Sequence, residues 1–117
     1  MPVALSRLFR KAPPEPRWIE VAALRDALAG AVPPLVLDVR GTDEFDGPLG
    51  HIAGARNMPL PELATHHGEI AGAARPVICV CLTDKRSSAA AAQLAAAGID
   101  GVSVLRGGMK AWREAGL

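Results

Sequence analysis

The stretch from residue 77 to residue 87 restricts the possible folds of this chain more than any other part of its sequence. It opens with five apolar residues, 77–81, whose length and composition are typical of a strand covered on both faces. After a short loop, Ser87 and the alanine-rich residues 89–97 predict a helix, which we expect to end at Gly98. A buried strand, a short loop and a helix in this order indicate an α/β fold.

Short apolar runs and helical stretches also alternate through the rest of the chain. Further strands are predicted at residues 18–19, 35–39, 55–58 and 101–105. Further helices are predicted at residues 20–29, from Pro61 to about His66, and at residues 109–115. Because strands and helices alternate, we expect a parallel sheet with helices packed against both of its faces.

The first sixteen residues differ in composition from those that follow. Residues 12–16 read Ala-Pro-Pro-Glu-Pro, which is typical of a linker. We therefore expect residues 1–16 to form an N-terminal extension and residues 17–117 to form one domain. Within the extension, residues 3–11 have the spacing of a short amphipathic helix, which we interpret as a surface-docked terminus, with a membrane-surface segment as the alternative.

The composition argues against several classes of protein. The net charge is +1, and no basic stripe with interleaved aromatic residues suggests a nucleic-acid partner. No apolar stretch is long enough to span a membrane, and charged residues interrupt the start of the chain, so it makes a poor signal peptide. Two cysteines do not make a secreted disulfide framework. We therefore expect a cytoplasmic protein.

Cys81 is the candidate nucleophile. The predicted topology places it at the carboxyl end of a strand and facing the amino end of a helix, where open α/β sheets bind ligands. Backbone N–H groups, the helix dipole and the cations Lys85 and Arg86 favour the thiolate, which is the nucleophilic form. Cys79 lies inside the strand, and we interpret it as a small buried apolar residue. A disulfide between the two cysteines is not expected, because both side chains leave the same face of one strand.

Other polar residues have supporting or structural interpretations. Asp38 and Arg40 end another buried strand at the same edge of the sheet, and an ion pair between Asp38 and Arg86 would position the Cys81 loop. His51 is expected to hold a turn. No metal site and no cofactor is predicted, because the chain has no zinc-ligand spacing and no glycine-rich phosphate loop after a strand.

Four motifs, taken in order along the chain, resemble those of the single-domain rhodaneses, which are sulfurtransferases. They are Leu37-Asp38-Val39-Arg40 with Glu44-Phe45, then Gly50-His51-Ile52-Ala53-Gly54-Ala55-Arg56-Asn57-Met58-Pro59, then residues 81–87, and finally Arg106-Gly107-Gly108-Met109-Lys110-Ala111-Trp112. The resemblance extends from Ile19 to the C-terminus. It implies a rhodanese-like α/β fold, with a five-stranded parallel sheet flanked by helices on both faces.

The resemblance also implies a chemistry and a set of site residues. Cys81 would accept sulfur from thiosulfate or a persulfide and hold it as a persulfide, which cyanide, a thiol or a sulfur-accepting protein would then remove. Asp38 and Arg40 would support the site. The N–H groups of the active-site loop would form an anion-binding nest. That loop comprises Leu82, Thr83, Asp84, Lys85, Arg86 and Ser87.

There are three alternatives to this sulfurtransferase interpretation. Phosphatases and arsenate reductases on this fold have one more residue between the cysteine and the arginine, so the four residues between Cys81 and Arg86 favour a sulfurtransferase. A non-catalytic interaction module would not need to keep both of those residues. A relay that passes sulfur to a protein partner stays open, because Asp84 stands where the family often has glycine and its carboxylate opposes anionic donors. Aspartate tolerates the left-handed backbone that glycine allows, so we expect the loop to close.

Overall fold

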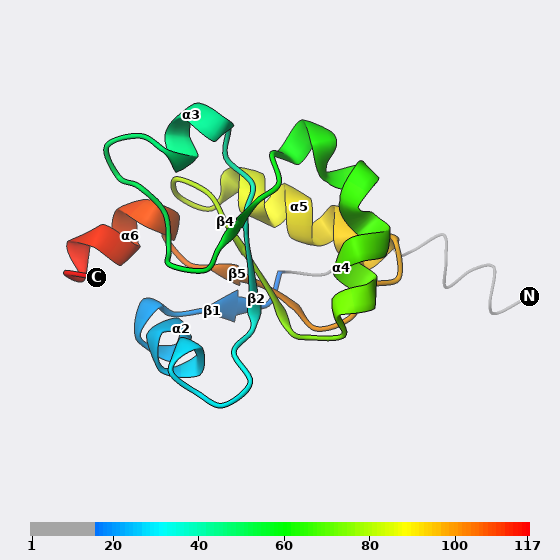
Figure 1. The fold of residues 1–117 in the computed structure, drawn as a ribbon, viewed down its shortest axis with the longest axis horizontal. Helices are drawn as coiled ribbons and strands as arrows, with labels where there is room; N and C mark the ends of the chain where they lie inside the picture. Colours follow the sequence, from blue (N-terminus) through cyan, green and yellow to red (C-terminus); the bar gives the residue numbers. More distant parts are fainter. Residues whose placement is uncertain (1–15) are drawn as a thin grey trace, which may run out of the picture.

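A computed structural model describes residues 16–117 of the chain. Five short strands form one sheet at the centre of the molecule (Figure 1). Their order across the sheet is β1-β5-β4-β2-β3, and every neighbouring pair is parallel. The strands are β1 (Trp18–Ile19), β2 (Leu35–Asp38), β3 (Arg56–Asn57), β4 (Val77–Val80) and β5 (Val102–Leu105). The predicted five-stranded parallel sheet is thus confirmed. The expected amphipathic helix at residues 3–11 lies outside the described residues.

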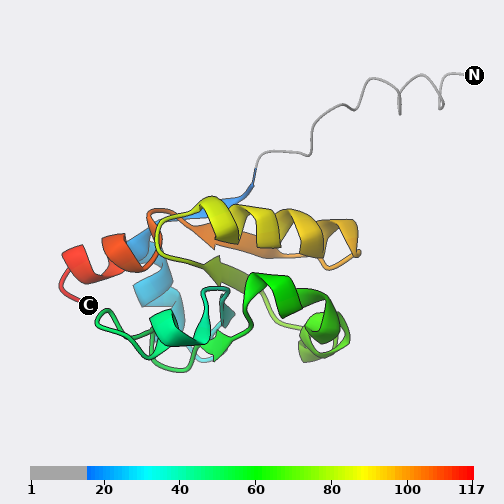
Figure 2. The ribbon, with the colours of Figure 1, turned by 90° about the horizontal axis from the view of Figure 1, so that it is seen from above.

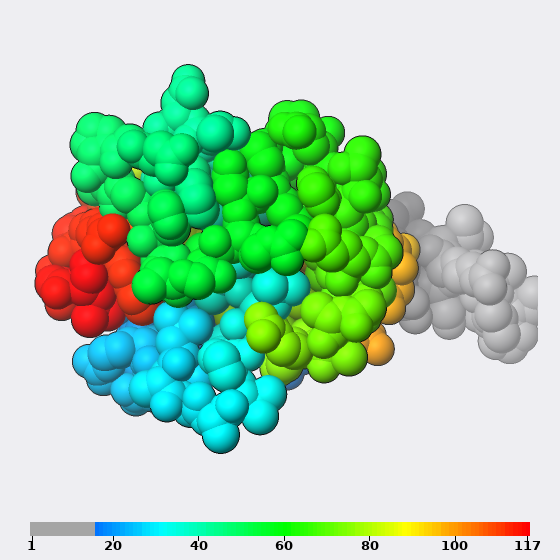
Figure 3. Space-filling view, in the orientation of Figure 1, coloured from blue at the N-terminus to red at the C-terminus, as the bar shows by residue number. Residues whose placement is uncertain are grey.

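Helices cover both faces of this sheet. They are α2 (Val21–Leu28), α3 (Thr42–Phe45), the 3-10 helix η1 (Leu60–His66), α4 (His67–Ala73), α5 (Lys85–Ala96) and α6 (Gly108–Glu114). Side chains of η1, α4 and α5 pack into the apolar core on one face of the sheet, and side chains of α2 and α6 pack into the core on the other. On the face shown in the space-filling view, α2 (blue), the segments with α3, η1 and α4 (teal and green) and α6 (red) lie at the surface (Figure 3).

The alternation of side chains along β4 decides which way the candidate nucleophile points. Val77 and Cys79 belong to the core under α5, while Ile78 and Val80 belong to the core under α2 and α6. Cys81 is next in the alternation and joins the α5 side. Helix α5, whose amino end Cys81 was expected to face, therefore covers this residue.

The boundaries of some helices differ from those expected. Helix α5 begins at Lys85, with Asp84 as the preceding N-cap residue, so that Ser87 already lies in its first turn. It ends as predicted, since Gly98 has φ +84° and the N–H of Ile99 donates to the carbonyl of Leu94 at 3.0 Å. The segment that starts near Pro61 is a 3-10 helix that continues into α4, which the sequence did not separate.

The fold gathers the carboxyl ends of the strands at one end of the molecule. The N–H of Val39 donates to the carbonyl of Val80 at 2.9 Å, which continues the pairing of β2 with β4 up to this edge. Figure 2 shows α3, the start of α5 and α6 together at this end. Arg40 and Cys81 each follow directly from this last pair, so the two candidate motifs meet here. Within residues 16–117, no helix is long and apolar enough to cross a membrane.

Candidate active site

The thiol of Cys81 lies at the amino end of α5. The residue is 1 % exposed, and its Sγ accepts a hydrogen bond from the backbone N–H of Ser87 at 3.3 Å. The hydroxyl of Ser87 is also 3.3 Å from this sulfur, and Ser87 itself is fully buried. The sulfur therefore has two polar contacts and the positive end of a twelve-residue helix beside it, which together stabilise negative charge.

Helix α6 holds the loop after β4 from the outside. The N–H of Met109 donates to the carbonyl of Cys81 at 2.8 Å. The N–H of Lys110 donates to the carbonyl of Leu82 at 3.0 Å. A Cβ atom on Gly108 would overlap the carbonyl oxygens of residues 81–83, and this glycine has φ +59°. Only a glycine fits here, so the closing glycine motif shapes the candidate active-site loop.

The contact with α6 also orients the N–H groups of the loop. The carbonyl oxygens of residues 81–83 lie against Gly108, and in a planar trans peptide the next N–H points the opposite way. The N–H groups of residues 82–84 therefore face away from α6. Lys85 and Arg86 open α5, and N–H groups in the first turn of a helix have no intrahelical partner. The loop thus carries its carbonyl groups on one side and its N–H groups on the other.

Asp84 does not adopt a left-handed conformation. Its φ is −152°, and none of the loop residues 82–87 has a positive φ. The loop therefore closes without the backbone freedom of a glycine at this position. The side chain of Asp84 is partly exposed and makes no capping hydrogen bond to α5, although it occupies the N-cap position.

Asp38 forms its ion pair with Arg40, so the expected Asp38–Arg86 pair is wrong. Nε of Arg40 lies 2.9 Å from Oδ1 of Asp38, and Nη2 lies 2.8 Å from Oδ2. Both residues are 1 % exposed, and Nη2 also donates to the carbonyl of Gly50 at 2.6 Å. The chain turns at the end of β2, which brings the backbone N–H of Arg40 within 3.1 Å of Oδ1 and folds its side chain back over the carboxylate.

Arg86 pairs instead with Glu44 on α3. Nη1 lies 2.6 Å from Oε1 and Nη2 lies 2.9 Å from Oε2, so the contact is bidentate. Hydrogen bonding from Arg86 is the main reason why the pKa of Glu44 falls from 4.5 to about 2. The N–H of Gly41 also donates to Oε1 at 3.3 Å. Glu44 was expected only as a motif residue, and its pairing with Arg86 was not predicted from the sequence.

Two residues of the second motif hold backbone near the site. Nδ2 of Asn57 donates to the carbonyl oxygens of Asp38 and Arg40 at 3.0 and 2.9 Å, which fixes the end of β2. Nδ1 of His51 lies 2.9 Å from the carbonyl of Phe45, and the two rings stack with centroids 3.6 Å apart. His51 therefore holds a turn, as expected, whereas the contribution of Asn57 was not anticipated.

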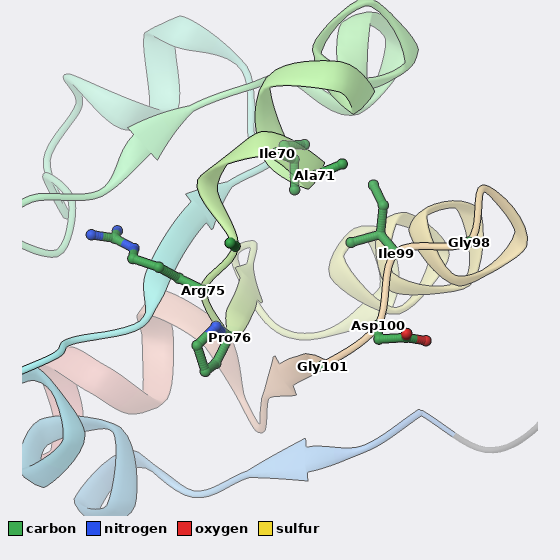
Figure 4. A pocket seen from close by; sticks show the side chains of 9 residues that line it. Ile70, Ala71, Arg75, Pro76, Gly98, Ile99, Asp100 and Gly101 are labelled. Carbon is green, nitrogen blue, oxygen red and sulfur yellow. The ribbon is translucent and has the colours of Figure 1, made fainter.

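Two hollows, one beyond the carboxyl end of α5 and one along this helix, do not include Cys81 or residues 82–87. One of about 380 Å³ is bordered by Arg75, Pro76 and residues 98–101 (Figure 4). The other, of about 800 Å³, runs along the alanine-rich face of α5 and shares residues 99–101 with the first. The first hollow lies beyond the far end of α5, which is about 18 Å long, whereas the second also reaches Ser88 and Ala89 near the amino end of the helix. Neither hollow is lined by Cys81 or Ser87.

Within the described part of the chain, no three His, Cys, Asp or Glu side chains come together as metal ligands. The adjacent histidines have different neighbours. Nδ1 of His66 lies 3.3 Å from Oε1 of Glu69, and Nε2 of His67 lies 3.1 Å from Nε2 of Gln93.

The comparisons with known sequences agree with these motifs. The chain matches the model of the rhodanese-like domain family over residues 20–115. The uncharacterized protein YqhL of Bacillus subtilis is 42% identical over 77 residues, which are 66% of this chain and 59% of that protein. The thiosulfate sulfurtransferase GlpE of Shewanella oneidensis is 39% identical over 80 residues, which are 68% of this chain and 76% of that protein. For a similar protein of Synechocystis the matched share of its length is 45%, so the chain spans only about half of some relatives.

Solved structures show the same fold. A rhodanese-related protein of Thermoplasma volcanium has a TM-score of 0.73 and 30% identity, with 86% of this chain and 93% of that chain covered. A thiosulfate sulfurtransferase of Pseudomonas aeruginosa has a TM-score of 0.77 and 29% identity, with 86% of this chain and 19% of that chain covered. The strand order, the cysteine loop and these matches define a rhodanese-fold protein. The chain belongs to the rhodanese-like domain family.

The close approach of Gly108 to the loop can be tested with an added methyl group. We expect Gly108→Ala to lower the free energy of unfolding by more than about 1 kcal/mol, because both its φ and its contacts exclude a Cβ. Gly72→Ala on α4 is the matched control, because nothing lies within 4 Å of the added atom. This control should be neutral or stabilising by up to about 1 kcal/mol in urea unfolding. Equal effects of the two changes would contradict the assigned contact.

The buried Asp38–Arg40 pair makes a prediction about stability. Asp38→Ala leaves a buried guanidinium without its carboxylate and should cost about 3–5 kcal/mol in urea unfolding. The double variant Asp38→Leu/Arg40→Met removes both charges and should recover most of this loss. If the single change cost less than about 1 kcal/mol, the pair would not be the fixed contact described above.

The Glu44–Arg86 pair should make stability depend on pH in the acidic range. The pKa of Glu44 is lowered on folding, so its contribution is complete above about pH 5 and is lost as the pH falls from its ordinary value of 4.5 towards 2. The pair is partly exposed, so Glu44→Gln should cost no more than about 1 kcal/mol at pH 7. The difference between variant and parent should disappear near pH 2. A difference that stays constant over this range would argue against the pair as its source.

Proposed function

We propose that this protein is a sulfurtransferase that carries sulfane sulfur as a persulfide on Cys81. The observation that carries the proposal is the position of Sγ, which contacts the N–H and the hydroxyl of Ser87 at the amino end of α5. Sequence relatives and structural neighbours that are thiosulfate sulfurtransferases support the same chemistry. Cys81 is also the last residue before a tight loop at the sheet edge where α/β folds bind ligands.

The transfer takes place in two balanced steps. In the first step, the Cys81 thiolate attacks the outer sulfur of the donor, and the donor's S–S bond breaks. The leaving group departs with the bonding electron pair, as sulfite from thiosulfate or as a thiolate from a persulfide. In the second step, a thiolate or cyanide attacks the outer sulfur of the Cys81 persulfide, and Cys81 leaves as a thiolate. Neither step needs a cofactor.

The loop supplies the stabilisation that this chemistry requires. The thiolate and the persulfide are both anions, and the N–H groups of residues 82–87 form a nest for negative charge. Ser87 is the member of this set that contacts the sulfur directly. Cys79 cannot replace Cys81 in this role, because burial and the neighbouring Cys81 raise its pKa to about 12.

One observation favours a relay to a protein partner as the second candidate. Leu82, the residue after Cys81, is 38% exposed, and in the described part of the chain Val32 is the other large apolar residue exposed to this extent. An exposed apolar side chain next to a reactive cysteine is suited to contact a docking protein surface. This candidate has the same Cys81 persulfide and differs only in donor and acceptor.

Intact-mass spectrometry tests the proposed persulfide. Protein treated with thiosulfate or with a small persulfide should gain the mass of one sulfur atom, and cyanide should remove it. The gain should be absent in Cys81→Ser and retained in the matched control Cys79→Ser. If no donor adds sulfur to the folded parent protein, or if Cys81→Ser still gains it, the proposed function is wrong.

A further inference from the structure

We propose that the carboxylates of Glu44 and Asp84 cancel the cationic charge of Lys85 and Arg86, so that the site prefers persulfide donors with one negative charge to the thiosulfate dianion. This inference rests on the proposed function, because it concerns which donor loads Cys81. It names Glu44, on a different helix from the loop, as a residue that determines donor specificity.

The first half of the cancellation is the ion pair between α3 and α5. Two nitrogens of the Arg86 guanidinium contact the two oxygens of Glu44, at 2.6 and 2.9 Å. The carboxylate is therefore fixed beside the cation that would otherwise attract an anionic donor. The pKa of Glu44 is held at about 2, so the negative charge persists throughout the pH range of an enzyme assay.

The charge on Arg86 acts close enough to matter at Cys81. Arg86 lies in the first turn of α5, next in sequence to the residue that contacts the sulfur. The pKa of Arg86 is raised mainly by hydrogen bonding to Glu44. Coulomb interactions with Glu44, Cys81 and Asp38 raise it further by smaller amounts. A group that responds to the charge of Cys81 also acts on a donor that approaches Cys81.

The second half of the cancellation lies in the loop itself. Asp84 is partly exposed and keeps its carboxylate free of a capping bond to α5. It is adjacent to the exposed Lys85 at the start of the helix. The two cations and two carboxylates sum to zero, which leaves neutral backbone N–H groups as the main attraction for a donor.

Donor charge then decides how strongly each donor is affected. Thiosulfate carries two negative charges, whereas the persulfide of a neutral thiol carries one when ionised. The interaction energy of a donor with an uncancelled cation is proportional to the donor's charge. Neutralising one carboxylate should therefore increase the loading rate with thiosulfate by about the square of the increase seen with a persulfide.

The experiment compares rate constants for the loading of Cys81 with sulfur at low ionic strength. Samples of the reaction are quenched, and the loaded fraction is measured by intact-mass spectrometry. The donors are thiosulfate and the persulfide of 2-mercaptoethanol. For Glu44→Gln and for Asp84→Asn, we expect loading by thiosulfate to rise about tenfold and loading by the persulfide about threefold. In about 0.5 M salt both increases should shrink, because the freed charges are near the surface.

Two further variants separate charge from structure. Glu44→Asp keeps the negative charge and should keep the parent's ratio of the two rates within about twofold. Asp100→Asn removes a carboxylate at the far end of α5 and should change neither rate. Asp84→Asn leaves the Glu44–Arg86 pair intact, so it tests the charge argument independently of that pair.

The outcomes distinguish this proposal from the function on which it rests. If the parent protein loads sulfur but neither neutralised variant shifts the ratio towards thiosulfate, the specificity proposal is overturned and the sulfurtransferase assignment stands. An equal shift in Asp100→Asn would also overturn it. If the parent protein accepts sulfur from neither donor, the sulfurtransferase assignment itself is wrong.

Discussion

The hydrogen bonds from the amino end of α6 to the loop after β4 are the interaction on which the candidate site depends. They take up the carbonyl groups of Cys81 and Leu82, and the contact is close enough to require Gly108. Because the carbonyl groups are held on that side, the N–H groups of the loop turn to the other. The final helix of the chain thus determines how a loop much earlier in the sequence presents its backbone, and α5 can begin directly beside the thiol.

Charges at this end of the molecule are paired at two depths, with different consequences. The Asp38–Arg40 pair is buried, and together with Asn57 it fixes how the chain leaves β2. The Glu44–Arg86 pair is partly exposed and connects α3 to α5. A buried pair is costly to break, whereas an exposed pair contributes little to stability. The main effect of the outer pair is therefore on the electric field around the loop.

Local patterns in the sequence were enough to predict the five parallel strands, the buried Cys79 and the position of Cys81 before α5. Short apolar runs and the end of the alanine-rich helix at Gly98 carry this information within a few residues. The partner of Arg86 could not be found in this way, because Glu44 is 42 residues away and pairs with it only through the fold. Asp38 was assigned the wrong partner because its spacing to Arg40 does not reveal the turn after β2. The two consecutive glycines at residues 107–108 were visible in the sequence, but the contact of Gly108 with the carbonyl oxygens of residues 81–83 was not.

The inert thiol of Cys79 bears on how long the proposed Cys81 persulfide would last. A persulfide beside a reactive thiol is short-lived, because the thiolate can attack the inner sulfur, close a disulfide and release hydrosulfide. Cys79 is buried with a pKa of about 12, so almost none of it is thiolate at neutral pH. Two residues along an extended chain also separate the Cα atoms by about 6.6 Å, near the upper limit for a disulfide. A Cys81 persulfide would therefore be protected from attack by Cys79, and its outer sulfur would be removed only by an external acceptor.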